Sequence, residues 1–479
     1  MVMRPLNLIG SIILARLLDP ADFGSVALAM VLLESTNIFA GLSMSQAYIQ
    51  SDLDAHSSAF HAFVITAVSS SFLFLITFFN VAWLASFLGD PAIEPILRAL
   101  TLLIPLGALS LVPFGILSKE LKFGAIAKAS VISTTISLIS TILLAFLGAG
   151  VWSLVIGNLL RVLFEMIFTW LFTPGWNWVK PVPWDWTVVK SLMRFGLPAT
   201  GAGFVAFFYS KWDDWLVGRH LGTTSLGYYS KAYDFTHRMI NQISTNVVGS
   251  VFFPTYVKLR DQKEKMLEAY SKSVQLLSTI MFPIGMGLLS TSALLIPVLL
   301  GEKWSPMVPT FQVFSILVLT RPISVNTSSI FSATGIPQHN LYAGMILTAV
   351  LVPMALLLLP YGIVGVATAV LMGDTVGLAY NLNRINKILP GALKATFIAT
   401  LPPLAAAIIM ALIVIGAQNL LLSKMDANIW SLTIIISLGV FVYFAGTLLF
   451  QKEFSKDVIQ TIVRVINPKD LLAKIRITG

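Results

Sequence analysis

The sequence predicts an all-α polytopic membrane protein, and three observations support this fold class. Of the 479 residues, 56% are hydrophobic and only 11% are charged, whereas about 25% of residues are charged in soluble globular proteins. Apolar runs long enough to cross a hydrocarbon core recur along almost the whole chain. Lysines and arginines gather in alternate loops, as expected when positive charge is retained on the cytoplasmic side.

The apolar runs predict about fourteen transmembrane helices, each of roughly 20 residues. Their approximate ranges are 6–18, 23–45, 60–88, 93–117, 125–147, 151–173, 195–217, 226–254, 273–300, 307–332, 340–360, 362–386, 395–416 and 429–450. The first run is short, and the seventh, eighth and tenth are more polar than the others. With both termini in the cytoplasm, the cytoplasmic loops hold roughly four lysines and arginines for every one outside.

Two stretches outside these runs are predicted to lie on the membrane surface. Residues 174–194 join the sixth and seventh runs and contain a cluster of tryptophans, whose indole rings favour the headgroup layer. We interpret them as an interfacial linker. In the tail, 451–479, apolar residues between Phe454 and Ile466 share one helical face opposite a basic face. This pattern predicts a cytoplasmic amphipathic surface helix, or a helix packed on another protein.

The sequence resembles itself at two places. The stretch "ARLLDPADFGSVALA", from residue 15, aligns with "GRHLGTTSLGYYSKA", from residue 218, and this alignment matches Gly24 with Gly227. The stretches "GVWSLV" and "GIVGVA" match Gly150 with Gly362. Because an even number of predicted spans separates matched points, two six-helix lobes would run in parallel, as in transporters that bind substrate between their lobes. Chance similarity between membrane sequences is the alternative.

These patterns together predict the domain organisation. An N-terminal lobe covers 1–173, with a short first helix, and the interfacial linker covers 174–194. A C-terminal lobe covers 195–386, two further helices cover 387–450, and the cytoplasmic amphipathic tail covers 451–479.

Polar residues inside the runs form stripes along helices. A charge at the centre of a membrane helix costs about 2.5–3.5 kcal/mol on insertion scales, so each one needs a reason. Residues three or four apart share a helix face. The sets that follow this spacing are Glu34, Asn37 and Gly41; Asn158, Arg161, Glu165 and Thr169; Lys231, Asp234, Arg238, Asn241 and Thr245; and Arg321, Ser324 and Ser328. Two other runs add Lys211, Asp213, Asp214, Asp374 and Asn381. The stripes predict one water-filled cavity between the lobes.

Some of these charges have a structural alternative. Arg161 and Glu165 are four residues apart and would neutralise each other on one helix. The same holds for Asp234 with either Lys231 or Arg238. Lys211 would bind Asp214 and leave Asp213 free to titrate.

Three arginines without such neighbours are interpreted differently. Arg321 has no acid within a helical turn on its own helix, which makes it the best single candidate for an anion ligand. Arg16 and Arg219 lie at predicted outer ends of spans, where snorkelling to the interface is the favoured interpretation.

Several function classes lack their signatures. The chain has no cysteine, no G-x-x-x-x-G-K-[ST] phosphate loop and no H-E-x-x-H zinc pair. No predicted loop is long enough for a catalytic domain. We therefore predict no enzyme, no cofactor, no metal site and no catalytic residue. The formal charge of +9 is attributed to cytoplasmic loops, so no nucleic-acid partner is expected.

Three segments carry a resemblance to a known family. The stretches "ILARLLDPADFGSVALAMVLLESTNIFAGLSMSQAYIQ", "WDDWLVGRHLGTTSLGYYSKAY" and "GAGVWSLVIGNLL" resemble polysaccharide-exporter flippases of the O-antigen and colanic-acid type. These flippases belong to the multidrug/oligosaccharidyl-lipid/polysaccharide exporter superfamily. The resemblance covers essentially the whole chain, and Asp213 stands at the acid position of the second motif. Family members carry further residues before the first motif, so a truncated or short first span is expected here.

The resemblance implies a flippase in the bacterial cytoplasmic (inner) membrane that serves lipopolysaccharide or exopolysaccharide assembly. Its substrate would be an undecaprenyl-pyrophosphate-linked oligosaccharide, moved by alternating access coupled to protons or sodium ions. Membrane lipid and polysaccharide assembly proteins are the other expected partners. The candidate substrate-binding residues are Arg161, Lys211, Lys231, Arg238 and Arg321. The candidate ion-coupling residues are Glu34, Asp213, Asp214, Asp234 and Asp374.

Two other functions stay open at this point. A multidrug or other small-molecule exporter would share the architecture, although the many cavity cations disfavour cationic drugs. A membrane enzyme of envelope assembly would need a catalytic constellation, and the sequence contains none.

Overall fold

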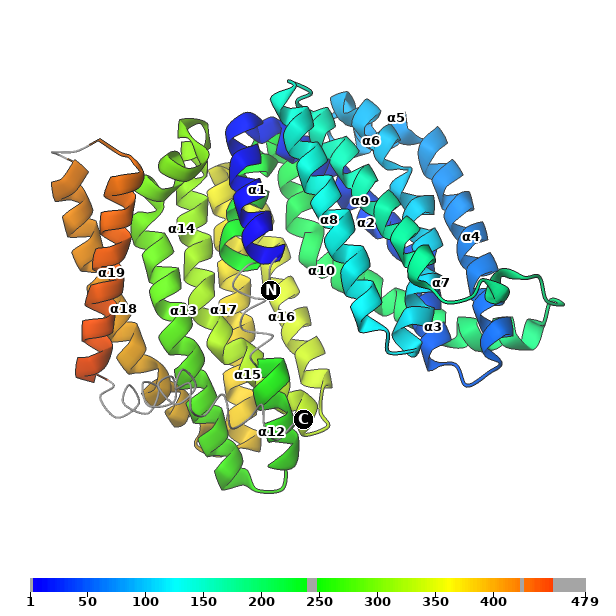
Figure 1. Cartoon of the computed structure of the whole chain (residues 1–479). Helices are drawn as coiled ribbons and strands as arrows, with labels where there is room; N and C mark the ends of the chain where they lie inside the picture. Colours follow the sequence, from blue (N-terminus) through cyan, green and yellow to red (C-terminus); the bar gives the residue numbers. More distant parts are fainter. Residues whose placement is uncertain (1–2, 239–247, 423–425, 451–479) are drawn as a thin grey trace, which may run out of the picture. The chain divides into compact units, whose positions relative to one another are not determined.

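The computed structural model describes residues 3–238, 248–422 and 426–450, and every regular element in these ranges is helical (Figure 1). The side chains of a few helical residues within these ranges, Arg238 among them, are not described. The contacts divide the chain after Lys231 into two compact units. The predicted interfacial tail, 451–479, and the stripe residues Asn241 and Thr245 lie outside the described residues.

The first unit contains nine complete helices within its described residues and most of a tenth. They are α1 (Met3–Leu17), α2 (Pro20–Gly41), α3 (Met44–Gln50), α4 (Ala55–Phe79), α5 (Val81–Leu88), α6 (Glu94–Leu100), α7 (Leu103–Lys119), α8 (Phe123–Phe146), α9 (Val151–Phe172) and α10 (Trp186–Tyr233). Helices α8 and α9 pack along each other, and α7 packs on α4 and α9 (Figure 1). The predicted run 60–88 consists of α4 and α5, which meet at Asn80.

The second unit begins with two π-helical turns, η3 (Asp234–Arg238) and η4 (Val248–Phe252). The α-helices that follow are α12 (Phe253–Lys258), α13 (Lys263–Leu300), α14 (Val308–Leu317), α15 (Arg321–Ala333), α16 (Gln338–Leu358), α17 (Gly362–Ile388), α18 (Ala392–Leu422) and α19 (Ile429–Phe450). Helix α13 packs along α18, and α16 packs along α17 (Figure 1).

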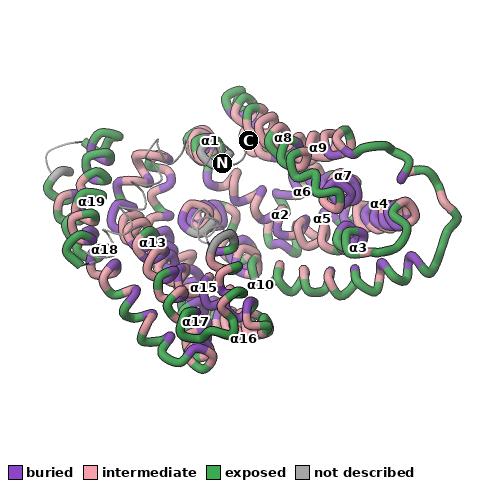
Figure 2. Tube along the Cα trace, turned by 60° about the horizontal axis from the view of Figure 1, so that its bottom comes forward, coloured by how far each residue is buried: buried purple, intermediate pink, exposed green. Residues whose placement is uncertain are grey.

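The membrane class is confirmed by the length and composition of the helices. Ten helical runs among the described residues are long and apolar enough to cross a membrane. Many helices bury one side and expose the other (Figure 2). Many exposed residues of α18 and α19 are large and apolar, with Leu412 65% exposed and Phe441 72% exposed. Such a surface requires lipid rather than water around it.

One apolar run contains two of the predicted spans. The run Gln338–Ile388 is 51 residues long, but the chain turns back at Gly362, which has a φ of 68°. Helices α16 and α17 therefore lie side by side. One apolar run can therefore contain two membrane spans, so the ten runs do not determine the number of spans. The number of fourteen spans stays a prediction.

In the first repeat pair, the helical structure is interrupted at the same aligned position of both segments. Asp19, with φ −84° and ψ 155°, separates α1 from α2, and its backbone N–H donates to the Asp22 carboxylate at 3.0 Å. The equivalent position in α10 is Gly222, whose φ of 85° and ψ of 168° interrupt the helix. This interruption divides α10 into two segments and falls between the predicted spans 195–217 and 226–254.

The two repeat segments also cross each other in the first unit. A Cβ atom at Gly24 would lie 1.7 Å from the Thr223 carbonyl oxygen, and one at Gly227 would lie 1.9 Å from the Pro20 carbonyl oxygen. Thr223 and Pro20 are themselves equivalent, because 203 residues separate the members of each matched pair. The contact is therefore reciprocal, and only glycine lets the backbones approach this closely.

The second repeat pair has matching backbone geometry. Gly150 has φ 55° and ψ −133° where α9 begins. Gly362 has φ 68° and ψ −153° where α17 begins. Residues that carry a side chain rarely adopt this backbone conformation. Both glycines therefore begin a helix with the same unusual turn. The two matched glycines thus share one backbone conformation at the start of a helix.

The segment 174–194 is anchored to α4 in the first unit. His61, which is fully buried, accepts the backbone N–H of Asp185 at its Nε2 atom, 3.0 Å away. Its Nδ1 atom then carries the proton and donates to the Ser57 carbonyl oxygen at 2.7 Å. The Thr187 hydroxyl and backbone N–H donate to the Asp185 carboxylate and hold its pKa below the usual range.

The tryptophans of this segment do not all share one environment. Trp178 is 7% exposed and packs on Phe63 and Trp170, whereas Trp186 is 72% exposed and Trp176 is 58% exposed. Trp178 is therefore a core residue, although it lies within the stretch predicted to be interfacial.

Candidate functional site

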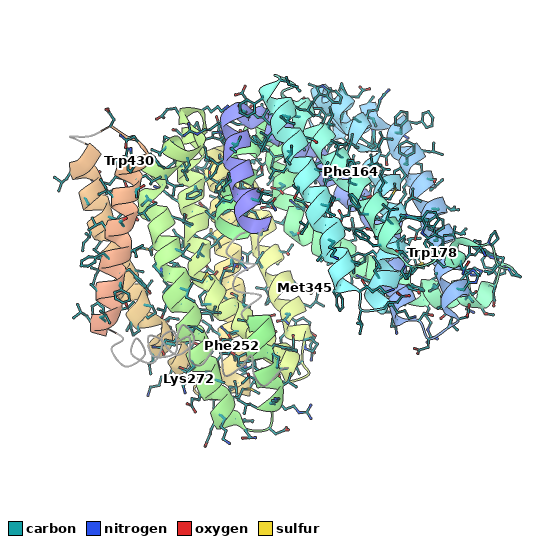
Figure 3. All side chains as sticks on the ribbon, in the orientation of Figure 1. Phe164, Trp178, Phe252, Lys272, Met345 and Trp430 are labelled. Atoms are coloured by element: carbon teal, nitrogen blue, oxygen red, sulfur yellow. The ribbon has the colours of Figure 1, made fainter. Side chains whose placement is uncertain are left out.

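The polar stripes of α2 and α9 meet at a pocket in the first unit. The pocket has a volume of about 250 Å³. Its lining residues are Asn37, Ala40, Gly41, Gly107, Ala108, Ser110, Leu111, Arg161, Val162 and Glu165. Phe164, labelled on α9 in Figure 3, is a neighbour of Glu165 in the chain. The pocket thus contains one cationic, one anionic and two neutral polar side chains. The small residues in its wall leave open space beside them.

Arg161 and Glu165 form the pair that their spacing allowed. The Arg161 Nη1 atom lies 3.4 Å from the Glu165 Oε2 atom, and the two side chains are 41% and 39% exposed. A pair of this kind on a helix contributes only about 0.3–0.5 kcal/mol. Arg161 is therefore easily available to a stronger anion. Glu34, on the same face of α2, is partly buried and does not line the pocket.

Three charged residues cluster in the first segment of α10. Lys211 Nζ lies 2.9 Å from Asp214 Oδ2, so the predicted pair is confirmed. Asp213, 8% exposed, accepts a hydrogen bond of 2.6 Å from the hydroxyl of Tyr229. That bond joins the two segments of α10 across the interruption at Gly222. Sequence reasoning missed Tyr229, because the interruption removes any helical periodicity between the two residues.

Lys231 is buried against the first two helices. It is 6% exposed, its Nζ atom donates to the Ser11 hydroxyl at 2.9 Å, and it lies 4.0 Å from the centre of the Phe23 ring. A hydroxyl and an aromatic face both stabilise an ammonium group. Ser11 and Phe23 gave no signal in the sequence, because neither follows the polar spacing.

The stripe continues into the π-helical turn η3. Asp234 begins this turn and is partly buried. Arg238 ends it, but its side chain lies outside the described residues. π-helical turns are frequent at functional sites, and the predicted role of Arg238 stays a prediction.

The second unit pairs Arg321 with an acid on another helix. Arg321 Nη2 lies 3.7 Å from Asp374 Oδ1, and the two side chains are 20% and 11% exposed. Arg321 is the first residue of α15, and Asp374 lies in α17. As the sequence predicted, Arg321 has no acid within a turn of its own helix. The acid that pairs with it comes from α17, a distant part of the chain.

Helix α17 also carries two buried acceptors with unused capacity. Asp374 Oδ2 and Asn381 Oδ1 have no hydrogen-bond partner among the residues that the structure describes. They lie seven residues apart, on one face of the helix. Carboxylate and amide oxygens are ligands for a hard cation, and a carboxylate can also take up a proton.

The candidate residues thus form separate groups within the two units. Arg161 lines a pocket with Glu165, while Lys211, Asp213 and Asp214 cluster in α10. Arg321 and Asp374 form their pair in the second unit. A single cavity between two lobes stays a prediction.

The fold is shared with solved membrane transporters. Lipid II flippase MurJ in an inward closed conformation superposes with a TM-score of 0.73 at 16% identity, over 94% of this chain and 97% of that one. An inward-facing multidrug resistance MATE family transporter gives 0.61 at 17% identity, over 80% of this chain and 94% of that one. The molecule is therefore an all-α membrane protein with the MATE/MurJ-like fold.

The family follows from the sequence match. Residues 13–309, more than half of the chain, match the family described as "Polysaccharide biosynthesis protein". The chain therefore belongs to this family, and the resemblance seen in the motifs is confirmed.

Named relatives are similar at low identity. The succinoglycan biosynthesis transport protein ExoT of Rhizobium meliloti (strain 1021) is 26% identical over 65% of this chain and 62% of its own length. The lipopolysaccharide biosynthesis protein WzxC of Escherichia coli (strain K12) is 21% identical over 68% and 66%. The match thus spans slightly less than two thirds of either relative.

Proposed function

We propose that this chain is a flippase for an undecaprenyl-pyrophosphate-linked oligosaccharide, acting in the export of surface polysaccharide. It would work in the bacterial cytoplasmic membrane with both termini in the cytoplasm. The family match and the MurJ-like fold support a lipid-linked substrate. We further propose two parallel six-helix lobes, with α18 and α19 outside the repeat. The paired breaks at Asp19 and Gly222 support this repeat.

The pocket at Arg161 is the observation that carries the proposal. A guanidinium group binds a phosphate by two parallel N–H···O bonds, and its present bond to Glu165 is long and half-exposed. A pyrophosphate carries more charge than a carboxylate, so it would displace Glu165 from Arg161. The amide of Asn37 and the hydroxyl of Ser110, in the same pocket, would bind sugar hydroxyls.

Substrate movement would be coupled to a proton or a sodium ion in the second unit. The unused oxygens of Asp374 and Asn381 support this role for α17. Binding of a cation beside Asp374 would weaken its pair with Arg321 and release the guanidinium toward substrate. Lys211, Lys231, Asp213, Asp214, Asp234, Glu34 and Arg238 remain further candidates for the two roles.

The decisive experiment compares matched arginine variants in a strain that lacks the chromosomal gene. Arg161→Ala should abolish most surface polysaccharide and should accumulate the lipid-linked oligosaccharide on the cytoplasmic leaflet. Arg98→Ala is the control, because Arg98 also pairs with an acid four residues away, Glu94, at 2.8 Å but does not line the pocket. It should retain full export at equal expression.

Two results would contradict the proposal. Full export by the Arg161→Ala strain would remove the pocket from the substrate pathway. If deletion of the gene instead changed drug resistance and left the lipid-linked oligosaccharide unchanged, a small-molecule exporter would be the better assignment.

A further inference from the structure

An arginine in the first unit is framed by a ladder of aromatic rings. Trp83 stacks on Phe87 with a centroid distance of 5.7 Å, and Phe87 stacks on Trp215 at 6.1 Å. The Arg219 guanidinium carbon lies 5.2 Å from the Phe87 ring and 5.7 Å from the Trp215 ring. Rings placed in this way hold a guanidinium in a fixed orientation.

Two N–H donors in this ladder have no acceptor. Arg219 Nη1 and Trp215 Nε1 are both buried and make no hydrogen bond to any residue that the structure describes. Arg219 also forms no ion pair within the described part of the chain. A buried donor without an acceptor is destabilising, and a charged donor more so. A ligand that supplied acceptor oxygens here would remove that penalty.

An apolar pocket begins at the other end of the ladder. It has a volume of about 450 Å³ and lies between α2, α4 and α5. Its lining residues are Leu32, Ser35, Thr36, Phe39, Leu73, Ile76, Thr77, Asn80, Trp83 and Leu84. Because Trp83 belongs to both the pocket wall and the ladder, two ring steps connect the apolar pocket to the Arg219 guanidinium. The combined shape suits a ligand with a hydrocarbon chain and an anionic head.

We propose that this site binds a bilayer phospholipid, with one acyl chain in the pocket and the headgroup phosphate on Arg219 and Trp215. Arg219 would donate two parallel N–H bonds to the phosphate, and the indole of Trp215 would donate a third. The Phe87 ring, 44% exposed, lies over the guanidinium and would turn aside to admit the headgroup.

The surroundings favour a phospholipid over the rarer polyprenyl carrier. Around the pocket, Phe72 is 61% exposed, Phe79 is 78% exposed and Trp83 is 65% exposed. This apolar surface faces the bilayer, where phospholipid is in large excess, and mass action then favours the abundant ligand. Lipid binding at this site is independent of which substrate the protein transports.

Native mass spectrometry of the full-length chain in detergent tests the site, with dioleoylphosphatidylglycerol as the probe. We expect Arg219→Gln to raise the Kd for one lipid at least tenfold. Trp215→Phe removes only the indole N–H and keeps the ring, so a rise of a few fold is expected. Leu32→Trp should fill the apolar pocket and also displace this lipid.

Arg98→Gln is the matched control for Arg219→Gln. Arg98 also lies over an aromatic ring, that of Phe78 at 5.5 Å, but it already has Glu94 as its acceptor. Its substitution should leave lipid binding unchanged. Equal lipid retention by wild type, Arg219→Gln and Leu32→Trp would overturn the site. If undecaprenyl phosphate displaced phosphatidylglycerol at equal concentration, the assignment to a bilayer phospholipid would be wrong.

Discussion

Arg321 and Asp374 face each other at 3.7 Å and join the first residue of α15 to the middle of α17. Both side chains are largely buried, 20% and 11% exposed, so the Asp374 carboxylate is held beside a buried cation. The pair connects two helices of the second unit that no sequence periodicity relates. It also leaves one carboxylate oxygen of Asp374 without a partner in the described chain.

Breaking this pair from one side is predicted to destabilise the protein. Arg321→Gln leaves a buried carboxylate without its cation, and such a change costs about 3–5 kcal/mol. Thermal unfolding of purified variants should show a large fall in Tm for this single substitution. The charge-neutral double variant Arg321→Gln with Asp374→Asn should recover most of the Tm while transport remains lost. If the single variant unfolded at the wild-type temperature, the pair would be structurally unimportant.

The reciprocal crossing of Gly24 and Gly227 is predicted to tolerate no side chain. A methyl group on either residue would overlap a carbonyl oxygen of the other helix, so the helices must separate. We expect Gly24→Ala to destabilise the protein by more than about 2 kcal/mol, as overpacked cores do.

The control for this substitution is another glycine in a helix. Gly201 lies in α10, and a Cβ atom there would meet nothing within 4 Å. Gly201→Ala should therefore leave Tm unchanged or raise it, because alanine favours a helix by about 1 kcal/mol over glycine. Comparable losses of Tm in both variants would show that the crossing is not responsible.

Tyr229→Phe is predicted to loosen α10 at its interruption. The substitution removes the hydroxyl that donates to Asp213 at 2.6 Å, and a typical hydrogen bond within a protein contributes about 0.5–1.5 kcal/mol. Hydrogen exchange of the backbone around Gly222 should become faster. Tyr361→Phe serves as control, since Tyr361 is 73% exposed and should leave exchange unaltered. An unchanged exchange rate in Tyr229→Phe would mean that packing alone holds the two segments together.

His61→Phe is predicted to release the segment 174–194 from α4. The variant keeps a ring of similar size but loses the hydrogen bonds of the imidazole to Ser57 and the one from Asp185. Trypsin should then cleave after Lys190 faster than in the wild type, whereas Lys180 precedes Pro181 and is not a trypsin site. His56→Phe loses only an exposed contact of 3.2 Å to the Lys180 carbonyl oxygen, so it should change cleavage less. Equal cleavage of all three proteins would exclude His61 as the anchor.

Local patterns in the sequence were sufficient to predict most helices and two of the charge pairs. Apolar runs follow α8, α9 and α17 closely, because helix and span coincide there. The pairs Arg161–Glu165 and Lys211–Asp214 follow from three- and four-residue spacing. Both depend only on residues of one helix, and helical geometry alone determines which of these meet.

Contacts between helices could not be predicted in this way. Asp374 reaches Arg321, and Ser11 reaches Lys231, from segments far apart in the chain, and spacing contains no information about such neighbours. The burial of Trp178 was missed for the same reason, because its partners Phe63 and Trp170 come from other helices. The aromatic frame of Arg219 likewise depends on α5, which no charge pattern connects to α10.

The contact at which the two repeat segments cross has the same reciprocal geometry as the interface of a symmetric dimer. In an isologous interface, residue i contacts residue j of the other copy and j contacts i. Gly24 approaches Thr223 while Gly227 approaches Pro20, which is this relation within a single polypeptide. The contact between α2 and α10 thus has the reciprocity of a two-fold interface, although one polypeptide supplies both sides of it.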